Sequence, residues 1–215
     1  MHVAILGGTG DIGEGLAVRF ADAGHHVHVG SRDAGKGEEK AAEYAERTGE
    51  DVVGGTNADA ARQADAVVVG VPYEYSVDTL EGVADALPEG APVVAPVVPM
   101  RRTEDGDFVY DPPAAGSATA ELRDAAPDGN PVAGAFHNLA ANRLAHLDAE
   151  LGVDVAVCGD PDAKATAVEL ADSVEGLRGL DVGGFAVASM VEGLTPLLID
   201  VAMKNDMHDL GVRFR

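Results

Sequence analysis

The chain has 215 residues, and its 37 Asp and Glu against 15 Lys and Arg give a formal net charge of −22 at pH 7. This balance argues against nucleic-acid binding and against a role at an anionic membrane surface, because both need clustered Lys and Arg and the sequence has no such cluster. Hydrophobic residues make up 46% of the chain, close to the ordinary globular figure. The composition therefore predicts a folded protein with an acidic surface.

The acidity is unusual in degree, since the chain has only four lysines and 4% aromatic residues. Such a charge repels itself at ordinary ionic strength, but in molar salt the Debye length falls to about 3 Å and most of the repulsion is screened. We therefore expect a cytoplasm rich in salt. The alternative is a moderately acidic enzyme from an ordinary cytoplasm.

No targeting or membrane segment is expected. Met1 is followed directly by a strand-like apolar run rather than by a basic segment and a long apolar one, and no apolar run is expected to reach the roughly 18 residues of a membrane helix. The single Cys158 cannot form an intrachain disulfide and is typical of a small core residue. These features predict a soluble, cytoplasmic protein.

Strand and helix signals alternate along the first half of the chain. An apolar strand ends at Leu6, a glycine-rich turn leads into a helix that stops at Gly24, and a short strand follows at 27–29. Further strands are predicted near 52–53, 65–71 and 92–99, with helices at about 36–47, 59–63 and 76–87. The run 65–71 is continuously apolar, as buried parallel strands are.

The second half begins with residues 101–129, which are rich in charge, Pro and Gly and predict a long surface connection into a helix at 118–124. Strands are then expected at 131–136, 153–158 and 177–182, and helices at 138–150, 162–174 and 187–203. This alternation predicts an α/β fold of Rossmann type, with a doubly wound parallel sheet. Length favours a large domain over residues 1–145 and a small C-terminal α/β lobe over 146–215.

The first glycine-rich turn carries the clearest motif, Gly8-x-Gly10-x-x-Gly13. It leaves a strand and opens a helix inside a short βαβ unit, which is the context that dinucleotide binding requires. Gly8 is expected to permit the tight turn, Gly10 to let the backbone approach a pyrophosphate, and Gly13 to let helix and strand pack closely. The phosphates would lie on amide groups at the helix N-terminus.

The second strand ends in Ser31 and Arg32, with Lys36 four residues beyond Arg32. A site selective for NAD places Asp or Glu here to accept a hydrogen bond from the ribose 2′-hydroxyl, whereas Ser and Arg suit a 2′-phosphate. In a chain with so few cations, two of them at this position predict NADP rather than NAD. The alternative is that both are ordinary solvated side chains.

No acid–base apparatus stands out. Residues 71–73 and 97–100 end two predicted strands at the edge of the sheet where a nicotinamide would bind, and their apolar side chains could surround it. The alternative is that these side chains only pack in the core or in a loop. His137, at the end of a predicted strand, is the best-placed titratable group, although a lone His there is more often a packed residue. Lys164 and Lys204 lie in no catalytic motif, and no nucleophilic triad or metal-ligand spacing is present, so we predict no catalytic residue and no metal.

At this point the chain resembles a known family, the NADPH-dependent reductases of the deazaflavin coenzyme F420, also called F420H2:NADP oxidoreductases. The similarity runs nearly from end to end, and the GGTG turn, the Ser-Arg pair and the C-terminal segment make it fairly specific. The stretches that carry it are residues 3–17, 24–32, 93–99, 154–160 and 192–214. With the acidic composition, the resemblance implies an enzyme from a halophilic archaeon.

The resemblance implies reversible hydride transfer between NADP(H) and F420, in which both rings carry the hydride themselves and the protein holds them face to face. It assigns Thr9, Gly10, Asp11 and Ile12 to the pyrophosphate, and the set Ser31, Arg32 and Lys36 to the 2′-phosphate. It also implies a homodimer that pairs through the apolar helix at 187–203.

On the side of the two rings, the same resemblance places Tyr73, Val98 and Ala141 beside the nicotinamide. His137, Leu139 and Leu210 would line the deazaflavin pocket, to which the C-terminal lobe contributes.

Two other functions are also compatible with the sequence. An NADPH-dependent imine or carbonyl reductase would share the N-terminal domain, but it would need a proton donor and a longer helical C-terminal domain. A non-catalytic NADP(H) sensor would bind the nucleotide without turnover and would present a surface to a partner protein.

Overall fold

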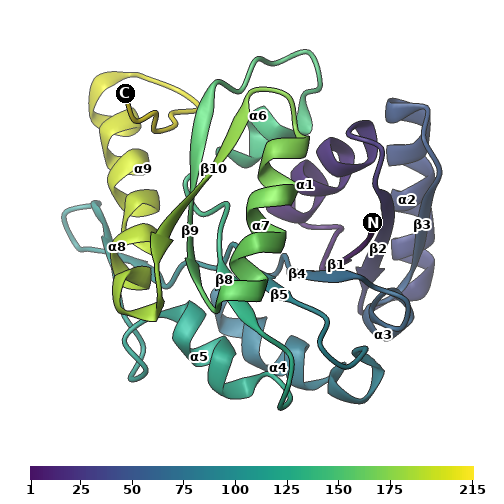
Figure 1. Cartoon of the computed structure of the whole chain (residues 1–215). Helices are drawn as coiled ribbons and strands as arrows, with labels where there is room; N and C mark the ends of the chain where they lie inside the picture. Colours follow the sequence, from purple (N-terminus) through teal and green to yellow (C-terminus); the bar gives the residue numbers. More distant parts are fainter.

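The computed structural model describes all 215 residues, and its centre is one sheet of eight strands (Figure 1). The strands lie in the order β10-β9-β8-β5-β4-β1-β2-β3. Their bounds are β1 (His2–Leu6), β2 (His26–Ser31), β3 (Val52–Thr56), β4 (Ala66–Val69), β5 (Val93–Ala95), β8 (Val132–Gly134), β9 (Val153–Gly159) and β10 (Leu177–Gly183).

Neighbouring strands are parallel except for β8 and β9, which pair antiparallel through Ala133 with Gly159 and Gly134 with Cys158. The chain first moves outward from β1 to β2 and β3, then crosses to β4 on the other side of β1. The reversal of direction between β1 and β4 is the position at which doubly wound sheets bind ligands. Residues 146–215 continue the same sheet with β9 and β10.

Helices cover both faces of the sheet, as the predicted fold requires. Side chains alternate along the strands, so Val3 and Ile5 belong to one core cluster while Ala4 and Leu6 belong to the other. The first face carries α1 (Asp11–Asp22), α2 (Ala34–Thr48), α6 (Ala141–Ala145) and α7 (Pro161–Ser173); the second carries α3 (Asn57–Ala61), α4 (Ser76–Glu81), α5 (Ala118–Ala125) and α8 (Ala188–Glu192). Three short 3-10 turns are η1 (Tyr73–Tyr75), η2 (Ala84–Ala86) and η3 (Phe185–Val187).

Two sequence predictions are wrong in detail. The helix expected at 138–150 is reduced to α6, because the buried Arg19 side chain takes the carbonyl oxygens that a longer helix would need. Its guanidinium donates to the carbonyls of Arg143, Leu144, His146, Leu147 and Ala149.

The connection expected at 101–129 contains a small antiparallel hairpin, β6 (Met100–Arg102) and β7 (Phe108–Tyr110). The C-terminal helix α9 (Leu194–Asn205) stabilises it, since the Asp200 carboxylate accepts a hydrogen bond from the amide of Phe108 at 2.9 Å and Lys204 pairs with Asp107 at 2.5 Å. These partners are about 90 residues away in the sequence, so a local pattern does not reveal them.

The apolar helix predicted at 187–203 is present as η3, α8 and α9, with a turn residue at Gly193 between the two helices. The run Phe185–Asn205 has 21 residues and, by length and composition alone, is long and apolar enough to cross a membrane. This corrects the expectation that no such run exists. Glu192 and Asp200 within it nevertheless make hydrogen bonds to α5 and β7, which is the behaviour of a helix packed on a globular domain.

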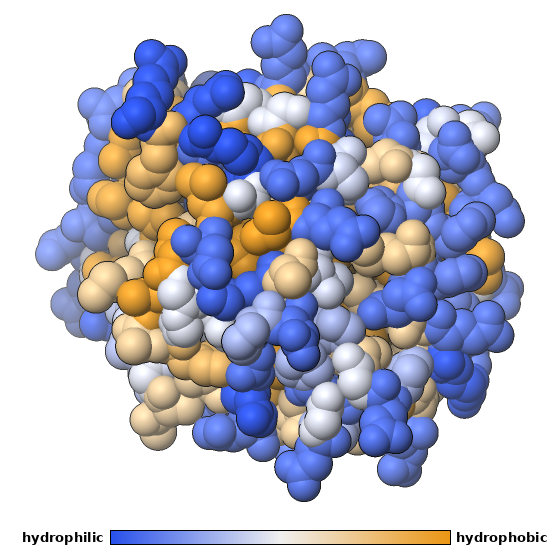
Figure 2. All heavy atoms as spheres, viewed as in Figure 1, coloured by the Kyte–Doolittle hydropathy of each residue, from blue (hydrophilic) through white to orange (hydrophobic).

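The outer face of this run is apolar and exposed. Figure 2 shows the hydrophobic side chains gathered on the left of the view, over the position of α8 and α9 in Figure 1. The exposed members include Met190, Leu197, Val201 and Met203.

Candidate functional site

The glycine motif lies where β1 ends and α1 begins, at the reversal between β1 and β4. The residue with left-handed backbone is Gly7, with φ of 73°, so the tight turn belongs to Gly7 and not to Gly8 as predicted. A Cβ on Gly13 would lie 2.5 Å from the Gly7 carbonyl oxygen and 2.8 Å from the Gly8 Cα, so the lack of a side chain there lets α1 pack closely on the turn after β1. A Cβ on Gly10 would meet the Gly7 and Gly70 carbonyl oxygens at 3.5 and 3.8 Å, which are ordinary contacts, so the protein itself has room for a side chain there. The absence of one leaves this space free for a ligand.

This loop offers unpaired donors to an anion. The amides of Thr9, Asp11, Ile12 and Gly13 have no acceptor within the protein, whereas that of Gly10 donates to Gly7 and that of Glu14 to Gly10. They lie at the first turn of a 12-residue helix, whose dipole favours negative charge. The site therefore fits the pyrophosphate of a dinucleotide.

Two residues that the sequence analysis did not identify form hydrogen bonds to the backbone of this loop from the protein interior. The Tyr44 side chain, fully buried on α2, donates its hydroxyl to the Gly8 carbonyl at 3.1 Å, and the Asn57 side-chain oxygen accepts from the amide of Gly7 at 3.1 Å. Burial, with the Glu14 carboxylate beside it, raises the pKa of Tyr44, so its hydroxyl remains a donor. The helical spacing of Ala41 and Tyr44 marks a buried face of α2, but not the contact that the hydroxyl makes.

The predicted 2′-phosphate residues lie together at the end of β2 and the start of α2. Ser31 is nearly buried and its hydroxyl accepts from the amide of Asp33 at 3.2 Å, while Arg32 and Lys36 are exposed. No carboxylate lies within 4.0 Å of either cation. The Arg32 guanidinium instead lies 5.7 Å from the centre of the exposed Tyr75 ring, a cation–π contact that the sequence did not suggest.

The residues predicted beside the nicotinamide follow β4 and β5 and begin α6. Val98 and Ala141 are partly exposed, and the carbonyl of Ala141 lies 3.2 Å from the Cβ position of Gly15 on α1, so α6 starts next to the phosphate-binding helix. Tyr73 packs against the second core cluster. Burial, followed by the nearby Glu121 carboxylate, raises the pKa of Tyr73 to about 12, which keeps its hydroxyl protonated.

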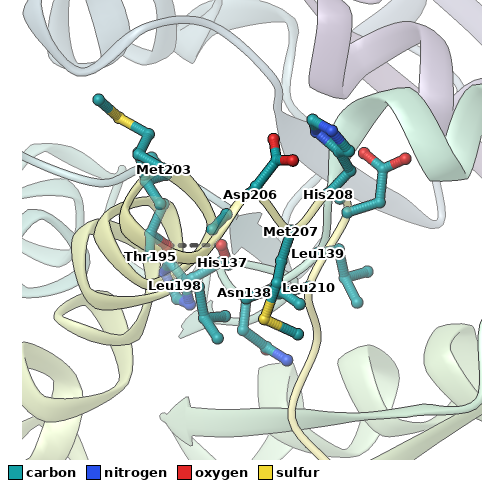
Figure 3. A pocket seen from close by; sticks show the side chains of 14 residues that line it. His137, Asn138, Leu139, Thr195, Leu198, Met203, Asp206, Met207, His208 and Leu210 are labelled. Atoms are coloured by element: carbon teal, nitrogen blue, oxygen red, sulfur yellow. Dashed lines mark hydrogen bonds between the residues drawn. The ribbon is translucent and has the colours of Figure 1, made fainter.

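His137 follows β8, directly after Phe136, whose φ of 66° is rare for a residue with a large side chain. Both ring nitrogens of His137 are buried without a partner, and burial lowers its pKa to about 3. The imidazole is therefore neutral at ordinary pH and does not serve as an acid. Its main-chain carbonyl accepts a hydrogen bond from the Thr195 hydroxyl at 2.6 Å, which ties β8 to α9 (Figure 3).

This contact forms one wall of a cavity of about 520 Å³, named here the apolar pocket. Figure 3 shows its side chains converging from three segments: residues 137–140, the helix α9, and the turn at 206–210. It brings His137, Leu139 and Leu210 together, as the resemblance implied, and adds Leu198, Met203 and Met207. A lining of this kind suits a flat aromatic ring.

Asp154 holds the C-terminal segment that closes the apolar pocket. Its nearly buried carboxylate pairs with Arg178 through two hydrogen bonds of 2.8 and 2.6 Å and accepts from the amide of Phe214 at 2.7 Å. These contacts, with that of Arg178 first, lower the pKa of Asp154. The turn that carries Leu210 is thus fixed on both sides, by α9 before it and by β9 after it.

Comparisons with known proteins agree with this geometry. Residues 2–99 match the family model described as NADP oxidoreductase, coenzyme F420-dependent. The F420-dependent NADP reductase of Methanothermobacter marburgensis is 38% identical over 99% of this chain and 97% of its own, and that of Methanocaldococcus jannaschii is 35% identical over the same shares.

A crystal structure from Arthrobacter sp. FB24, provisionally described as an F420-dependent NADP reductase, superposes with a TM-score of 0.82 at 24% identity and covers 100% of this chain and 99% of its own. At that identity the match establishes the fold alone. The full-length similarity to the two archaeal enzymes shows that the chain belongs to the family of F420-dependent NADP reductases.

Proposed function

We propose that this protein catalyses reversible hydride transfer between NADP(H) and the deazaflavin coenzyme F420. The observation that carries the proposal is that the glycine loop and the apolar pocket lie next to each other. The free amides of the glycine loop lie at the start of α1, and the apolar pocket begins at Ala140, next to Ala141, whose carbonyl lies against α1. A nucleotide on the loop and a ring in the pocket would meet at the carboxyl edge of the sheet.

The two ligands supply the redox chemistry, because one ring donates the hydride and the other accepts it. The chain's own contribution is binding, orientation and exclusion of water. The glycine loop and the pair Arg32 and Lys36 hold the nucleotide by its phosphates, and Val98 and Ala141 border the place where its reactive end would lie. The low pKa of His137 and the high pKa of Tyr73 leave neither side chain poised to move a proton near neutral pH, which suits hydride transfer between two rings.

The test is to mix the protein, NADPH and oxidised F420 in concentrated KCl and to follow the deazaflavin absorbance. Loss of the absorbance in proportion to NADPH oxidation is the expected result. NADPH binding without any absorbance change would favour a nucleotide sensor, and turnover of an imine or carbonyl compound in place of F420 would favour the other reductase class.

We also propose that two copies pair through the exposed apolar face of α8 and α9. Met190 and Leu197 are each more than half exposed, and Val201 on the same helical run is 37% exposed, so this run presents an apolar surface to solvent. Light scattering should give the mass of a dimer, and Leu197→Asp should give that of a monomer. A wild-type monomer at micromolar concentration would overturn the pairing.

The acidic surface supports the proposal of a salt-rich, cytoplasmic setting, such as that of a halophilic archaeon. Most of the 37 carboxylates have no cationic partner, and high ionic strength would screen their repulsion. The melting temperature should therefore rise steeply between low salt and molar KCl. Equal melting temperatures in both conditions would contradict the salt adaptation.

We propose in addition that two segments of the chain bind different ligands. Residues 1–145 would hold NADP, and residues 146–215 would supply α9 and the 206–210 turn to the deazaflavin pocket and α8 and α9 to the dimer contact.

A further inference from the structure

A second cavity opens beside the apolar pocket. It has a volume of about 370 Å³ and is lined by Asn142, Arg143, His146, Ala149, His208 and Asp209, and we name it the polar pocket. His208 and Asp209 line both cavities, so the two adjoin at the turn after α9. In Figure 3 the imidazole of His208 lies at the rim of the apolar pocket rather than among the apolar side chains below it.

The two cavities differ in chemistry. The apolar pocket is walled mainly by Leu, Met, Ile and Ala side chains, whereas only Ala149 of the polar pocket is hydrophobic. A ligand that fills both would have a flat apolar part joined to a strongly polar part.

Arg143 supplies a positive charge to the polar pocket. Its only hydrogen bond is from one guanidinium nitrogen to the main-chain oxygen of Asp209 at 3.2 Å, and no carboxylate lies within 4.0 Å of it. Most of its five N–H donors therefore remain available. Arg143 shares this lack of a carboxylate partner with Arg32 and Lys36 at the predicted 2′-phosphate site.

Other side chains of the polar pocket support an anion there. His146 is fixed by a hydrogen bond between Nδ1 and the carbonyl of Asn142 at 2.7 Å, and His208 is exposed and makes no hydrogen bond within the protein. An imidazole N–H on either ring can donate a hydrogen bond to an anion. One carboxylate opposes them, that of Asp209, and the side-chain amide of Asn142 donates to it at 3.2 Å.

We propose that the polar pocket binds the phosphate of the deazaflavin side chain, with Arg143 as the principal contact and His146 and His208 beside it. The inference rests on the proposed function, since F420 carries an anionic tail on its ring system. An acidic protein repels such a tail, and a local guanidinium that forms charge-assisted hydrogen bonds to phosphate offsets the repulsion.

The test compares two deazaflavins: F420 itself, and the same chromophore with its ribityl chain but without the phosphate and glutamate residues. Affinity is measured by deazaflavin fluorescence without nucleotide, and KM is measured with saturating NADPH. In Arg143→Gln, the Kd and KM for F420 should rise about tenfold or more, while those for the truncated compound should change less than about twofold. The KM for NADPH should stay at the wild-type value, and Arg143→Lys should restore part of the F420 affinity.

Two further variants separate binding from folding. Arg62→Gln, directly after α3, removes the same charge from an exposed arginine outside both cavities and should leave all constants unchanged. His146→Asn combined with His208→Asn leaves the bond between Arg143 and Asp209 intact and should weaken F420 alone. If Arg143→Gln weakens both deazaflavins equally, Arg143 serves only to hold the 206–210 turn, and the proposal is overturned.

Binding and hydride transfer by the wild-type protein distinguish failure of the anion site from failure of the proposed activity. If wild-type protein binds F420 more tightly than the truncated compound but transfers no hydride, the proposed activity fails while the anion site stands. If wild-type protein binds both deazaflavins equally, the anion site fails whether or not hydride transfer occurs.

Discussion

Tyr44 provides the sharpest test of how the glycine loop is held. Its hydroxyl donates to the carbonyl of Gly8 at 3.1 Å and lies 3.3 Å from the Glu14 carboxylate, and the side chain is fully buried. Tyr44→Phe keeps the ring that packs in the core and removes only this donor. The change therefore isolates the hydrogen bond from the packing.

The expected loss of stability follows from leaving the buried Gly8 carbonyl without a partner, which costs about 1–3 kcal/mol. In a domain of this size each kcal/mol lowers the melting temperature by about 2–4 °C, so the variant should melt roughly 2–12 °C lower. The KM for NADP should also rise several-fold, because the free amides begin one residue after Gly8, whereas the KM for F420 should not change.

The assay combines thermal unfolding with steady-state kinetics at a fixed KCl concentration. Tyr75→Phe is the control for loss of a tyrosine hydroxyl. The Tyr75 side chain is about half exposed, its hydroxyl makes no hydrogen bond within the protein, and Phe keeps the ring that contacts Arg32. If Tyr44→Phe melts within 1 °C of the wild type and binds NADP normally, Tyr44 only fills the core and the bracing role is refuted.

Three other predictions concern the same site. Replacing both Arg32 and Lys36 with Ala should reduce kcat/KM for NADP by about 10²–10⁴, since each charged hydrogen bond contributes about 1.5–3 kcal/mol. The kcat/KM for NAD should stay nearly constant. An unchanged ratio of kcat/KM for NADP to that for NAD would show that both residues are solvated side chains. The folded pKa of His137, about 3, lies below its unfolded value near 6.5, so the unfolded chain binds the extra proton and stability falls as the pH drops through this window. Acid unfolding of His137→Asn should be less steep there, and an identical pH dependence would count against the buried neutral imidazole. Gly10→Ala should fold with nearly wild-type stability and lose NADP affinity, whereas Gly13→Ala should lose both, because only at Gly13 does a Cβ meet backbone at 2.5 Å; calorimetry with and without NADP distinguishes these two outcomes.

Local sequence determined the nucleotide half of the site. A strand, a glycine-rich turn and a helix within 22 residues contain the whole phosphate-binding unit, and Ser31, Arg32 and Lys36 follow at the end of the next strand. Such a unit can be read from the sequence because its parts are neighbours in the chain. The salient error within it was small: the turn requires Gly7 in the left-handed region, and spacing alone could not separate Gly7 from Gly8.

Contacts between residues far apart in the sequence were decided only by the tertiary structure. Tyr44 and Asn57 reach the glycine loop from 36 and 50 residues away, and Arg19 shortens α6 by binding carbonyls up to 130 residues away. The apolar pocket forms where α9 and the 206–210 turn meet residues 137–140, and the hydrogen bond from Thr195 to His137 joins two of these segments.

The acidic composition itself predicted a charged surface but not where the few unpaired cations lie. Whether a cation is free depends on the carboxylates that folding brings near it, as the contrast between the paired Arg178 and the unpaired Arg143 shows. Sequence thus determined the fold class and the nucleotide loop, because the signals for both are local and periodic. The apolar pocket, the adjoining polar pocket and the bracing of the loop were decided by long-range packing, which no local pattern encodes.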